Sequence, residues 1–213
     1  MPRERRTFKR QETAERILAA AEEQFAAQGA AGARTDRIAA AAHANKAMLY
    51  YYFGDKSRLH RAVLENLFRQ LRSGVYAQGP QRRRSPREEL RSFIVGYFDF
   101  LATHPNYPRL VHREAMERTR NFDWIVRGYL RPFHKQLAGT IKRGVASGSL
   151  RRVNPAQAAF MIVGMITSYF AAAPILGEIV GRNLLSAGAI EERKEAVLDF
   201  VDHGLMPGGA RSR

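Results

Sequence analysis

Hydrophobic residues recur three or four positions apart along most of the chain, which is the spacing of an amphipathic helix. No segment shows the alternation of apolar and polar residues that is typical of a half-buried strand. The first helix is expected over residues 11–28, because Gly29 gives it a natural end. Its apolar face is formed by Ala14, Ile17, Leu18, Ala21 and Phe25. The pattern predicts an all-α fold.

Two short helices separated by a tight turn are predicted next. Thr35 precedes residues 36–41, and its hydroxyl is expected to cap that helix. The turn is His43-Ala44, and Asn45 is expected to cap a second helix over residues 46–52. A capped helix, a turn and another capped helix form a helix-turn-helix, whose second helix enters the major groove of DNA.

The second of these helices carries side chains that suit base recognition. Leu49 and Phe53 lie four positions apart and are expected to face inward. Lysine donors, phenol hydroxyls and apolar groups that contact thymine methyls are then left on the outer face. These outer residues are Lys46, Ala47, Met48, Tyr50 and Tyr51.

Two stretches of the sequence resemble the DNA-binding signature of the tetracycline-repressor (TetR) family. They are Thr35-Asp36-Arg37-Ile38-Ala39 and, after the turn, Asn45-Lys46-Ala47-Met48-Leu49-Tyr50-Tyr51-Tyr52-Phe53-Gly54-Asp55-Lys56. The shared pattern is Thr-x-x-Ile-Ala, a turn, and Leu-Tyr-x-x-Phe-x-x-Lys, and the resemblance covers roughly residues 11–60. The sequence departs from the pattern at His43, where the family usually has glycine, and at Ala44, where it usually has a branched aliphatic residue.

The resemblance implies contacts with operator DNA at the matching positions. It implies that Thr35 caps its helix and touches phosphate, and that Lys56 contacts phosphate at the start of the following helix. It also implies contacts with bases or backbone in the recognition helix, which we expect to involve Asn45, Lys46, Ala47, Met48, Tyr50, Tyr51 and Tyr52. The competing interpretation is a helix-turn-helix that never touches DNA, with Tyr50–Tyr52 as a packed aromatic cluster.

The remainder of the chain is predicted to be helical. Further helices are expected over residues 56–76, 87–103, 107–117, 121–147, 155–173 and 190–204, with breaks at Pro105, Pro108, Gly148, Pro174 and Gly188. The resemblance implies a basic arm (1–10), a DNA-binding domain (11–55), a ligand-binding and dimerisation domain (56–206) and a flexible tail (207–213).

Within the larger domain the resemblance implies a homodimer formed through the two C-terminal helices, residues 155–173 and 190–204. Gly164, Ala171 and Ala172 would allow close helix approach, although a central core helix of a monomer remains the alternative. A small-molecule pocket is expected among the middle helices, where aromatic and methionine side chains are frequent. The candidates are Phe93, Tyr97, Phe100, His112, Met116, Trp124, Tyr129, Phe133, Met161, Met165 and Tyr169.

Charge supports a polyanionic partner, since the formal net charge of the 213 residues is +15. Five basic residues lie within positions 1–10, but residues 127–152 hold seven more without an acid. Charge alone therefore does not select one DNA-binding face. The second run raises the hypothesis of an anionic effector, against the simpler interpretation of a solvated basic face.

Other function classes have little support in the sequence. Cysteine is absent, and the six histidines show no zinc motif of helical spacing, so no metal or cofactor is expected. The charged N-terminus lacks a secretory apolar run, which favours the cytoplasm. Residues 153–177 contain no charge but hold several polar groups, and we expect a core or interface helix rather than a membrane span. A helical ligand-binding protein or enzyme without specific DNA binding is the alternative function.

Overall fold

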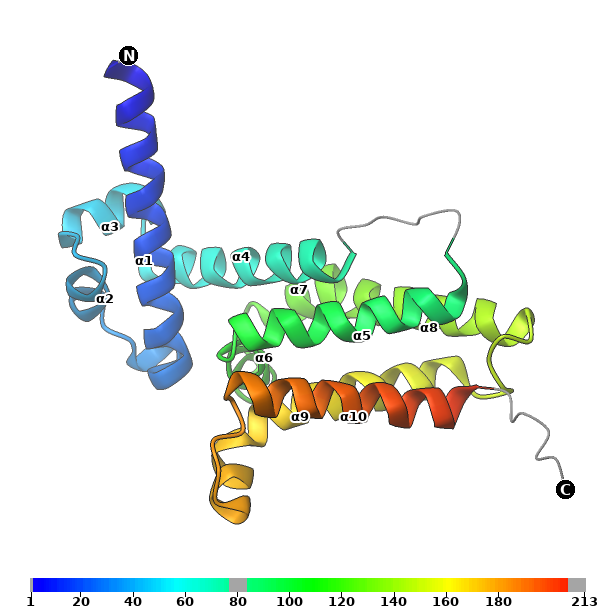
Figure 1. Cartoon of the computed structure of the whole chain (residues 1–213). Helices are drawn as coiled ribbons and strands as arrows, with labels where there is room; N and C mark the ends of the chain where they lie inside the picture. Colours follow the sequence, from blue (N-terminus) through cyan, green and yellow to red (C-terminus); the bar gives the residue numbers. More distant parts are fainter. Residues whose placement is uncertain (1, 77–83, 207–213) are drawn as a thin grey trace, which may run out of the picture. The chain divides into compact units, whose positions relative to one another are not determined.

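The structure of the protein is a computed structural model that describes residues 2–76 and 84–206, with side chains from residue 10 onward except at position 76. All regular elements in this part of the chain are helices (Figure 1). The described chain divides into two compact units. One comprises the residues up to Arg69 together with Arg109–Asn121, and the other comprises Gln70–Pro108 and the residues from Phe122 onward.

The first unit contains α1 (Pro2–Gly32), α2 (Thr35–Ala41), α3 (Lys46–Phe53), the first part of α4 (Lys56–Tyr76) and most of α6 (Tyr107–Glu117). Helices α1, α2 and α3 pack against one another. The buried residues repeat at the spacing seen in the sequence, so each helix places one apolar face inward. Fully buried side chains include Ile17, Phe25, Ile38, Leu49 and Leu59.

Helix α1 begins at Pro2, nine positions before the expected start at Gln11. The expected end at Gly29 is confirmed as a break, because Gly29 has φ 71° and ψ 174° and one more helical turn follows it. Glycine adopts this backbone conformation at little cost. A side chain at position 29 would also meet the guanidinium of Arg113, since a Cβ there would lie 2.7 Å from its Nη1.

The second unit contains α5 (Pro86–Thr103), α7 (Phe122–Ile125), the π-helical turn η1 (Val126–Leu130), α8 (Arg131–Ala146), α9 (Pro155–Val180) and α10 (Ala187–Leu205). Helix α5 is the centre of this unit and packs against α8, α9 and α10. Its buried face includes Ile94, Phe98 and Leu101, and the ring of Phe98 lies 6.0 Å from that of Phe170 in α9.

Several predicted helix boundaries are wrong. The expected breaks at Pro108 and Gly188 each lie at the second residue of a helix, α6 and α10, because the first turn needs no intrahelical N–H donor and tolerates either residue. The expected break at Pro174 is absent, because proline removes one backbone hydrogen bond but keeps a φ compatible with a helix. Helix α9 ends instead at Gly181, which has a left-handed φ of 68°. The single helix expected over residues 121–147 is interrupted by η1 ahead of Pro132, whose nitrogen carries no hydrogen to donate. The predicted tail, residues 207–213, lies outside the described residues.

Candidate nucleic-acid interface

The predicted recognition helix is α3, and its start is fixed by Asn45. The Asn45 Oδ1 accepts a hydrogen bond from the backbone nitrogen of Met48 at 2.7 Å, which confirms the expected cap. Leu49 is fully buried, as predicted, whereas Phe53 is only partly buried. Lys46, Ala47, Tyr50 and Tyr51 are exposed.

The turn before α3 is a tight one that contains a left-handed residue. His43 has φ 50°, in the left-handed region where the family usually places glycine. The backbone nitrogen of Ala44 donates to the carbonyl of Ala39 at 2.9 Å, which closes the turn. From α1, the Arg16 guanidinium donates to the carbonyl of Ala42 at 3.2 Å, so the turn is also held by the first helix.

The expectation that Thr35 caps α2 is wrong by one position. Thr35 is the first residue of α2, and the extended residue before it, Arg34, provides no side-chain cap. Asp36 supplies the local acceptor instead, because its carboxylate accepts from the backbone nitrogen of Arg37 at 3.0 Å. Its hydrogen bond with Arg34 lowers the pKa of Asp36. The Thr35 hydroxyl lies 3.4 Å from the Tyr50 hydroxyl, so both groups belong to the surface that α3 presents.

The three consecutive tyrosines are not buried together, although the Tyr51 and Tyr52 rings pack edge-to-face at a centroid distance of 5.3 Å. Tyr50 is 41% exposed and Tyr51 is 67% exposed, while Tyr52 is partly buried. The Tyr51 hydroxyl accepts a hydrogen bond from Arg10 of α1, whose guanidinium lies 5.3 Å from the tyrosine ring centroid. The ammonium of Lys46 lies 6.0 Å from the Tyr50 ring centroid. The exposed face of α3 therefore combines cations and phenols.

Lys56 has internal partners that the sequence did not reveal. Its ammonium donates to the backbone carbonyls of Ala31 and Ala33 at 3.0 and 3.2 Å. These carbonyls follow the Gly29 break, where the last residues of a helix lack intrahelical donors. Lys56 therefore fastens the start of α4 to the end of α1. A phosphate contact at this position stays a prediction.

The first unit also contains a buried polar cluster. His60 of α4 and Glu114 of α6 are both buried, with Nε2 and Oε1 3.3 Å apart. Thr119 donates to the other oxygen of Glu114, and the Asn121 amide lies 3.4 Å from His60 Nδ1. The His60 ring contacts Phe25 of α1 at a centroid distance of 4.5 Å. No pattern in the sequence predicts this cluster, because its members come from separate helices and loops.

The predicted pocket residues are only partly brought together. Phe93, Tyr97 and Phe133 form a ring cluster with centroid distances of 5.1 to 5.9 Å. The Tyr97 hydroxyl lies 2.8 Å from that of Thr167, and burial raises the pKa of Tyr97 to about 12. Tyr169 is also buried and donates to the Leu184 carbonyl at 2.7 Å.

The other candidates lie elsewhere. Trp124 and Tyr129 form a separate edge-to-face pair, and Phe100 stacks on His104. Met161 is exposed on α9. His112 and Met116 belong to the first unit, where His112 is exposed and Met116 is 85% exposed. A pocket role for these two residues stays a prediction.

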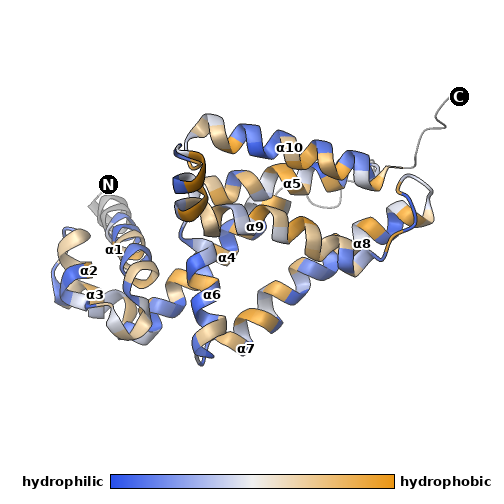
Figure 2. Cartoon of the chain, turned by 90° about the horizontal axis from the view of Figure 1, so that it is seen from below, coloured by the Kyte–Doolittle hydropathy of each residue, from blue (hydrophilic) through white to orange (hydrophobic). Residues whose placement is uncertain are grey.

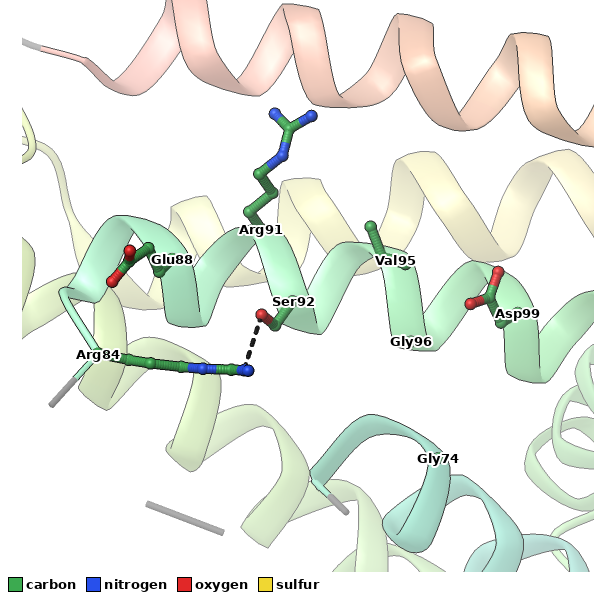
Figure 3. A pocket seen from close by; sticks show the side chains of 8 residues that line it. All are labelled: Gly74, Arg84, Glu88, Arg91, Ser92, Val95, Gly96 and Asp99. Atoms are coloured by element: carbon green, nitrogen blue, oxygen red, sulfur yellow. Dashed lines mark hydrogen bonds between the residues drawn. The ribbon is translucent and has the colours of Figure 1, made fainter. Parts of the chain in front are cut away.

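Two cavities in the second unit are lined by residues outside the predicted set. One, of about 520 Å³, lies between Gly74 of α4 and the face of α5 that carries Ser92 and Asp99 (Figure 3). Arg84 donates to Ser92 at 3.1 Å within it, and Glu88, Arg91 and Asp99 also line it. The other, of about 640 Å³, lies at the end of α9 around Pro174 and Arg182. Neither cavity could be predicted from the sequence, since each joins residues from separate turns or helices.

Comparison with known proteins agrees with this architecture. The model of bacterial regulatory proteins of the tetR family matches residues 17–63, and that of the tetracyclin repressor-like C-terminal domain matches residues 86–201. The HTH-type transcriptional repressor SCO4008 of Streptomyces coelicolor is 39% identical over 105 residues, which are 49% of this chain and 50% of the relative. The match thus spans about half the length of that curated relative.

Solved structures show the same fold over most of the chain. The ketosteroid transcriptional regulator KstR2 of Mycobacterium tuberculosis superposes with a TM-score of 0.75 and 17% identity, covering 91% of this chain and 95% of its own. AibR, in complex with isovaleryl coenzyme A and operator DNA, superposes with a TM-score of 0.71 and 19% identity, covering 88% and 97%. Since a C-terminal family model covers more than half of the sequence and an N-terminal one covers α2 and α3, the chain belongs to the TetR family of bacterial regulatory proteins.

Proposed function

We propose that the protein is a ligand-responsive transcriptional repressor that binds operator DNA through α3. The observation that carries this proposal is the exposed face of Lys46, Tyr50 and Tyr51 on a helix whose start is fixed by the Asn45 cap. A rigid helix that presents ammonium and phenol groups fits base-edge recognition in the major groove. Thr35 and Arg37, exposed or partly exposed on the preceding helix, would position the protein on phosphates.

A homodimer would supply the second recognition helix. The charge-free N-terminal part of α9 has an exposed stripe at helical spacing that includes Phe160, Met161, Gly164, Ser168 and Ala171. Phe160 and Met161 are 60% and 61% exposed, and Phe200 of α10 is 65% exposed. Contiguous exposed apolar surface of this kind marks an interaction site, and Figure 2 shows hydrophobic colour along α9. Pairing of α9 and α10 with the same helices of a second copy would present two half-sites about 34 Å apart.

Helix α9 is long and apolar enough to cross a membrane by length and composition. It packs against α5, α8 and α10, however, and Thr167 contacts the Tyr97 hydroxyl. These contacts are those of a helix in a helical domain. We assign its exposed stripe to a second subunit and the protein to the cytoplasm.

The effector site is assigned to the second unit, near the Phe93, Tyr97 and Phe133 rings. Aromatic walls with a few polar groups, here the Tyr97 and Thr167 hydroxyls, are typical of small-molecule sites. AibR shares the fold and is in complex with isovaleryl coenzyme A, which is an anionic molecule. The exposed basic residues Arg127, Arg131 and Lys135 of this chain are a second argument for an anionic effector. A thermal-shift screen in which neutral compounds stabilise the protein and anions do not would exclude that effector class.

Effector binding would lower operator affinity by the coupling free energy between the two sites, typically about 1–3 kcal/mol. Neither catalysis nor a resident cofactor is required for this cycle. The alternative, a ligand-binding protein or enzyme without specific DNA affinity, predicts no preference for any operator.

The decisive experiment is a titration of the protein against DNA from upstream of its own gene, with a scrambled duplex of equal length as the control. Near-physiological salt is essential, because a chain of net charge +15 binds any duplex at low salt. A preference for the upstream duplex, with a footprint of two related half-sites, is the expected result. No specific binding to upstream DNA or to a genomic fragment pool would overturn the proposal.

A further inference from the structure

Large apolar side chains are exposed at both ends of α9. Met161 near the N-terminal end is 61% exposed, and Ile175 and Ile179 near the C-terminal end are 68% and 73% exposed. The two isoleucines follow Met161 by about four and five helical turns, so all three residues lie on the same side of the helix. The exposed stripe therefore runs along most of α9 and has a large apolar group at each end.

The middle of this stripe is made of small residues. Gly164 and Ser168 are exposed there, and a Cβ at position 164 would meet no atom of the described chain within 4 Å. Glycine inside a helix is destabilising relative to alanine, and the packing of a single subunit gives no reason for it here. A second helix that crosses α9 at this point gives one, because the side chains at a crossing set how closely two helices approach.

The stripe is complementary to a second copy of itself. An isologous interface brings the same surface of both subunits together, so each pair of residues meets twice about the two-fold axis. If two copies of α9 cross antiparallel at Ser168, Met161 and Ile175 lie equally far from the crossing on opposite sides and meet each other. The large apolar groups then cover one another at both ends, while the small residues meet in the middle.

Charge favours the antiparallel direction. Glu178 is exposed near the C-terminal end of α9, and Arg152 is exposed shortly before the N-cap residue, Asn154. A parallel pair would bring the two Glu178 carboxylates together. An antiparallel pair directs each carboxylate toward the N-terminal end of the partner's α9, where the helix dipole is positive. Complementary charge of this kind selects one orientation of an interface over another.

A guanidinium group beside the middle of the stripe lacks a good acceptor. Arg193 of α10 lies with its Cζ 5.4 Å from the Tyr169 ring centroid, and its Nη2 donates to the Met165 carbonyl at 3.5 Å, which is long for a hydrogen bond. Its Nε is buried and has no hydrogen-bond partner in the described part of the chain. Such groups are rare and costly. Met165 and Tyr169 flank Ser168 in the sequence, so an acceptor brought to the crossing would lie close to Arg193.

We propose that α9 crosses the partner's α9 antiparallel at Ser168, and that Arg193 of each subunit donates to the partner's Ser168 hydroxyl. Ile175 of each subunit then covers Met161 of the other. The inference rests on the homodimer of the proposed function and assigns its register and its polar anchor. Any other register leaves two guanidinium groups poorly paired in the interface, so Arg193 acts as a specificity-determining residue of the assembly.

Cysteine cross-linking tests the register, because the chain has no cysteine of its own. Ser168→Cys should give a disulfide-linked dimer under mild oxidation, since a disulfide requires Cα atoms about 4.4–6.8 Å apart. Met161→Cys with Ile175→Cys in the same chain should be cross-linked by a short bis-maleimide, whereas neither change alone should be. Met116→Cys is the control for chance collisions, because Met116 is an exposed methionine of the first unit.

The polar anchor is tested by the dimer dissociation constant in analytical ultracentrifugation. Arg193→Met and Ser168→Ala should each raise this constant about tenfold or more, since each removes two charge-assisted hydrogen bonds per dimer. The two changes together should weaken the dimer little further, because both remove the same bonds. Arg91→Met is the matched control, since the acceptor of Arg91 is Asp202 of its own chain. Circular dichroism should show unchanged helical content in every variant.

A dimeric wild type whose Ser168→Cys variant does not cross-link would overturn the register and leave the proposed dimer intact. Cross-linking of Met161→Cys on its own would do the same, because it indicates a parallel pair. Additive losses in the combined variant, or an effect of Arg193→Met no larger than that of Arg91→Met, would overturn the bond to the partner's Ser168. A monomeric wild type would remove the proposed dimer and this inference with it.

Discussion

The imidazole of His60 and the carboxyl group of Glu114 meet inside the first unit, with Nε2 and Oε1 3.3 Å apart. His60 belongs to α4 and Glu114 to α6, and the Phe25 ring of α1 packs on the imidazole. One polar pair therefore joins three helices of the unit that holds α3. The polar atoms of His60 and Glu114 find their hydrogen-bond partners in each other and in Thr119 and Asn121. Substitution of either residue would therefore leave buried polar atoms without a partner.

Removal of the carboxyl group should destabilise this unit. Glu114→Ala leaves the His60 ring and the Thr119 hydroxyl without their acceptor in a buried site, which costs about 1–3 kcal/mol. Glu114→Gln keeps one oxygen and should cost less. Chemical denaturation at pH 7 measures both, with Glu117→Ala as the control, because Glu117 is exposed on the same helix. Equal losses in Glu114→Ala and Glu117→Ala would contradict a structural role for the pair.

Stability should fall in mild acid because of His60. Burial, helped by the charge of Lys56, lowers the pKa of His60 to about 4, whereas the unfolded chain keeps a value near 6.5. Between these values the unfolded state binds more protons, so the free energy of unfolding decreases as the pH falls from about 6.5 to 4. The full shift corresponds to about 3 kcal/mol at most.

Glu114 opposes this trend, because burial raises the pKa of its carboxyl group, so the folded state keeps that proton to a higher pH than the unfolded chain does. The His60 contribution is therefore isolated in a Glu114→Gln background. There, the free energy of unfolding should drop between pH 6.5 and 4, and the further change His60→Gln should flatten the profile. Parallel pH profiles for the two variants would show that His60 does not titrate with folding.

Substitutions of Lys56 and Lys46 should have different effects, one on the stability of the fold and the other on DNA binding. Lys56→Met removes two hydrogen bonds from an ammonium to the Ala31 and Ala33 carbonyls and should cost about 1–3 kcal/mol of unfolding free energy. Lys46→Met changes an exposed side chain and should leave the unfolding midpoint unchanged while weakening operator binding. Thermal unfolding without DNA, followed by duplex titration, tests the pair. An unchanged midpoint for Lys56→Met would restore the simpler assignment of Lys56 to phosphate.

Tyr50 should contribute sequence discrimination rather than general affinity. Its exposed hydroxyl lies beside Thr35 on the α3 surface. Tyr50→Ala should weaken operator binding by about 1–3 kcal/mol and change binding to a scrambled duplex much less. Tyr50→Phe distinguishes loss of the hydroxyl from loss of the ring. If Tyr50→Ala leaves operator affinity unchanged, the register assigned to the recognition helix is wrong.

Local signals in the sequence predicted much of this fold. The Asn45 cap and the break at Gly29 depend on neighbouring residues only, and both are confirmed. The start of α2 was misplaced by one residue, because helix capping depends on backbone angles that several polar residues can adopt. The extension of α1 to Pro2 was missed, since its charged residues show no apolar face.

Contacts between residues far apart in the sequence could not be predicted from such local signals. His60 and Glu114 are 54 positions apart, and neither residue type signals the other. The resemblance implies a phosphate contact for Lys56, whereas its carbonyl partners, Ala31 and Ala33, have no side-chain signature in the sequence. The pocket candidates were chosen by residue type, which does not distinguish the packed Phe93–Phe133 rings from the exposed Met116.

The exposed stripe of α9 makes a final prediction about assembly. The wild type should have twice the chain mass of 24.1 kDa in light scattering. Phe160→Glu with Met161→Glu places charges in the proposed interface and should yield monomers, because unpaired buried charges are strongly unfavourable. Met116→Glu is the control, since it makes a similar change at an exposed residue of the first unit.

The monomeric variant should keep its helical content but lose the high operator affinity that two linked recognition helices provide. Its affinity for a single half-site should match that of one wild-type head, so the loss would come from assembly rather than from damage to α3. A double variant that stays dimeric would show that the stripe is not the interface, and the two recognition helices would then have to be joined through another surface.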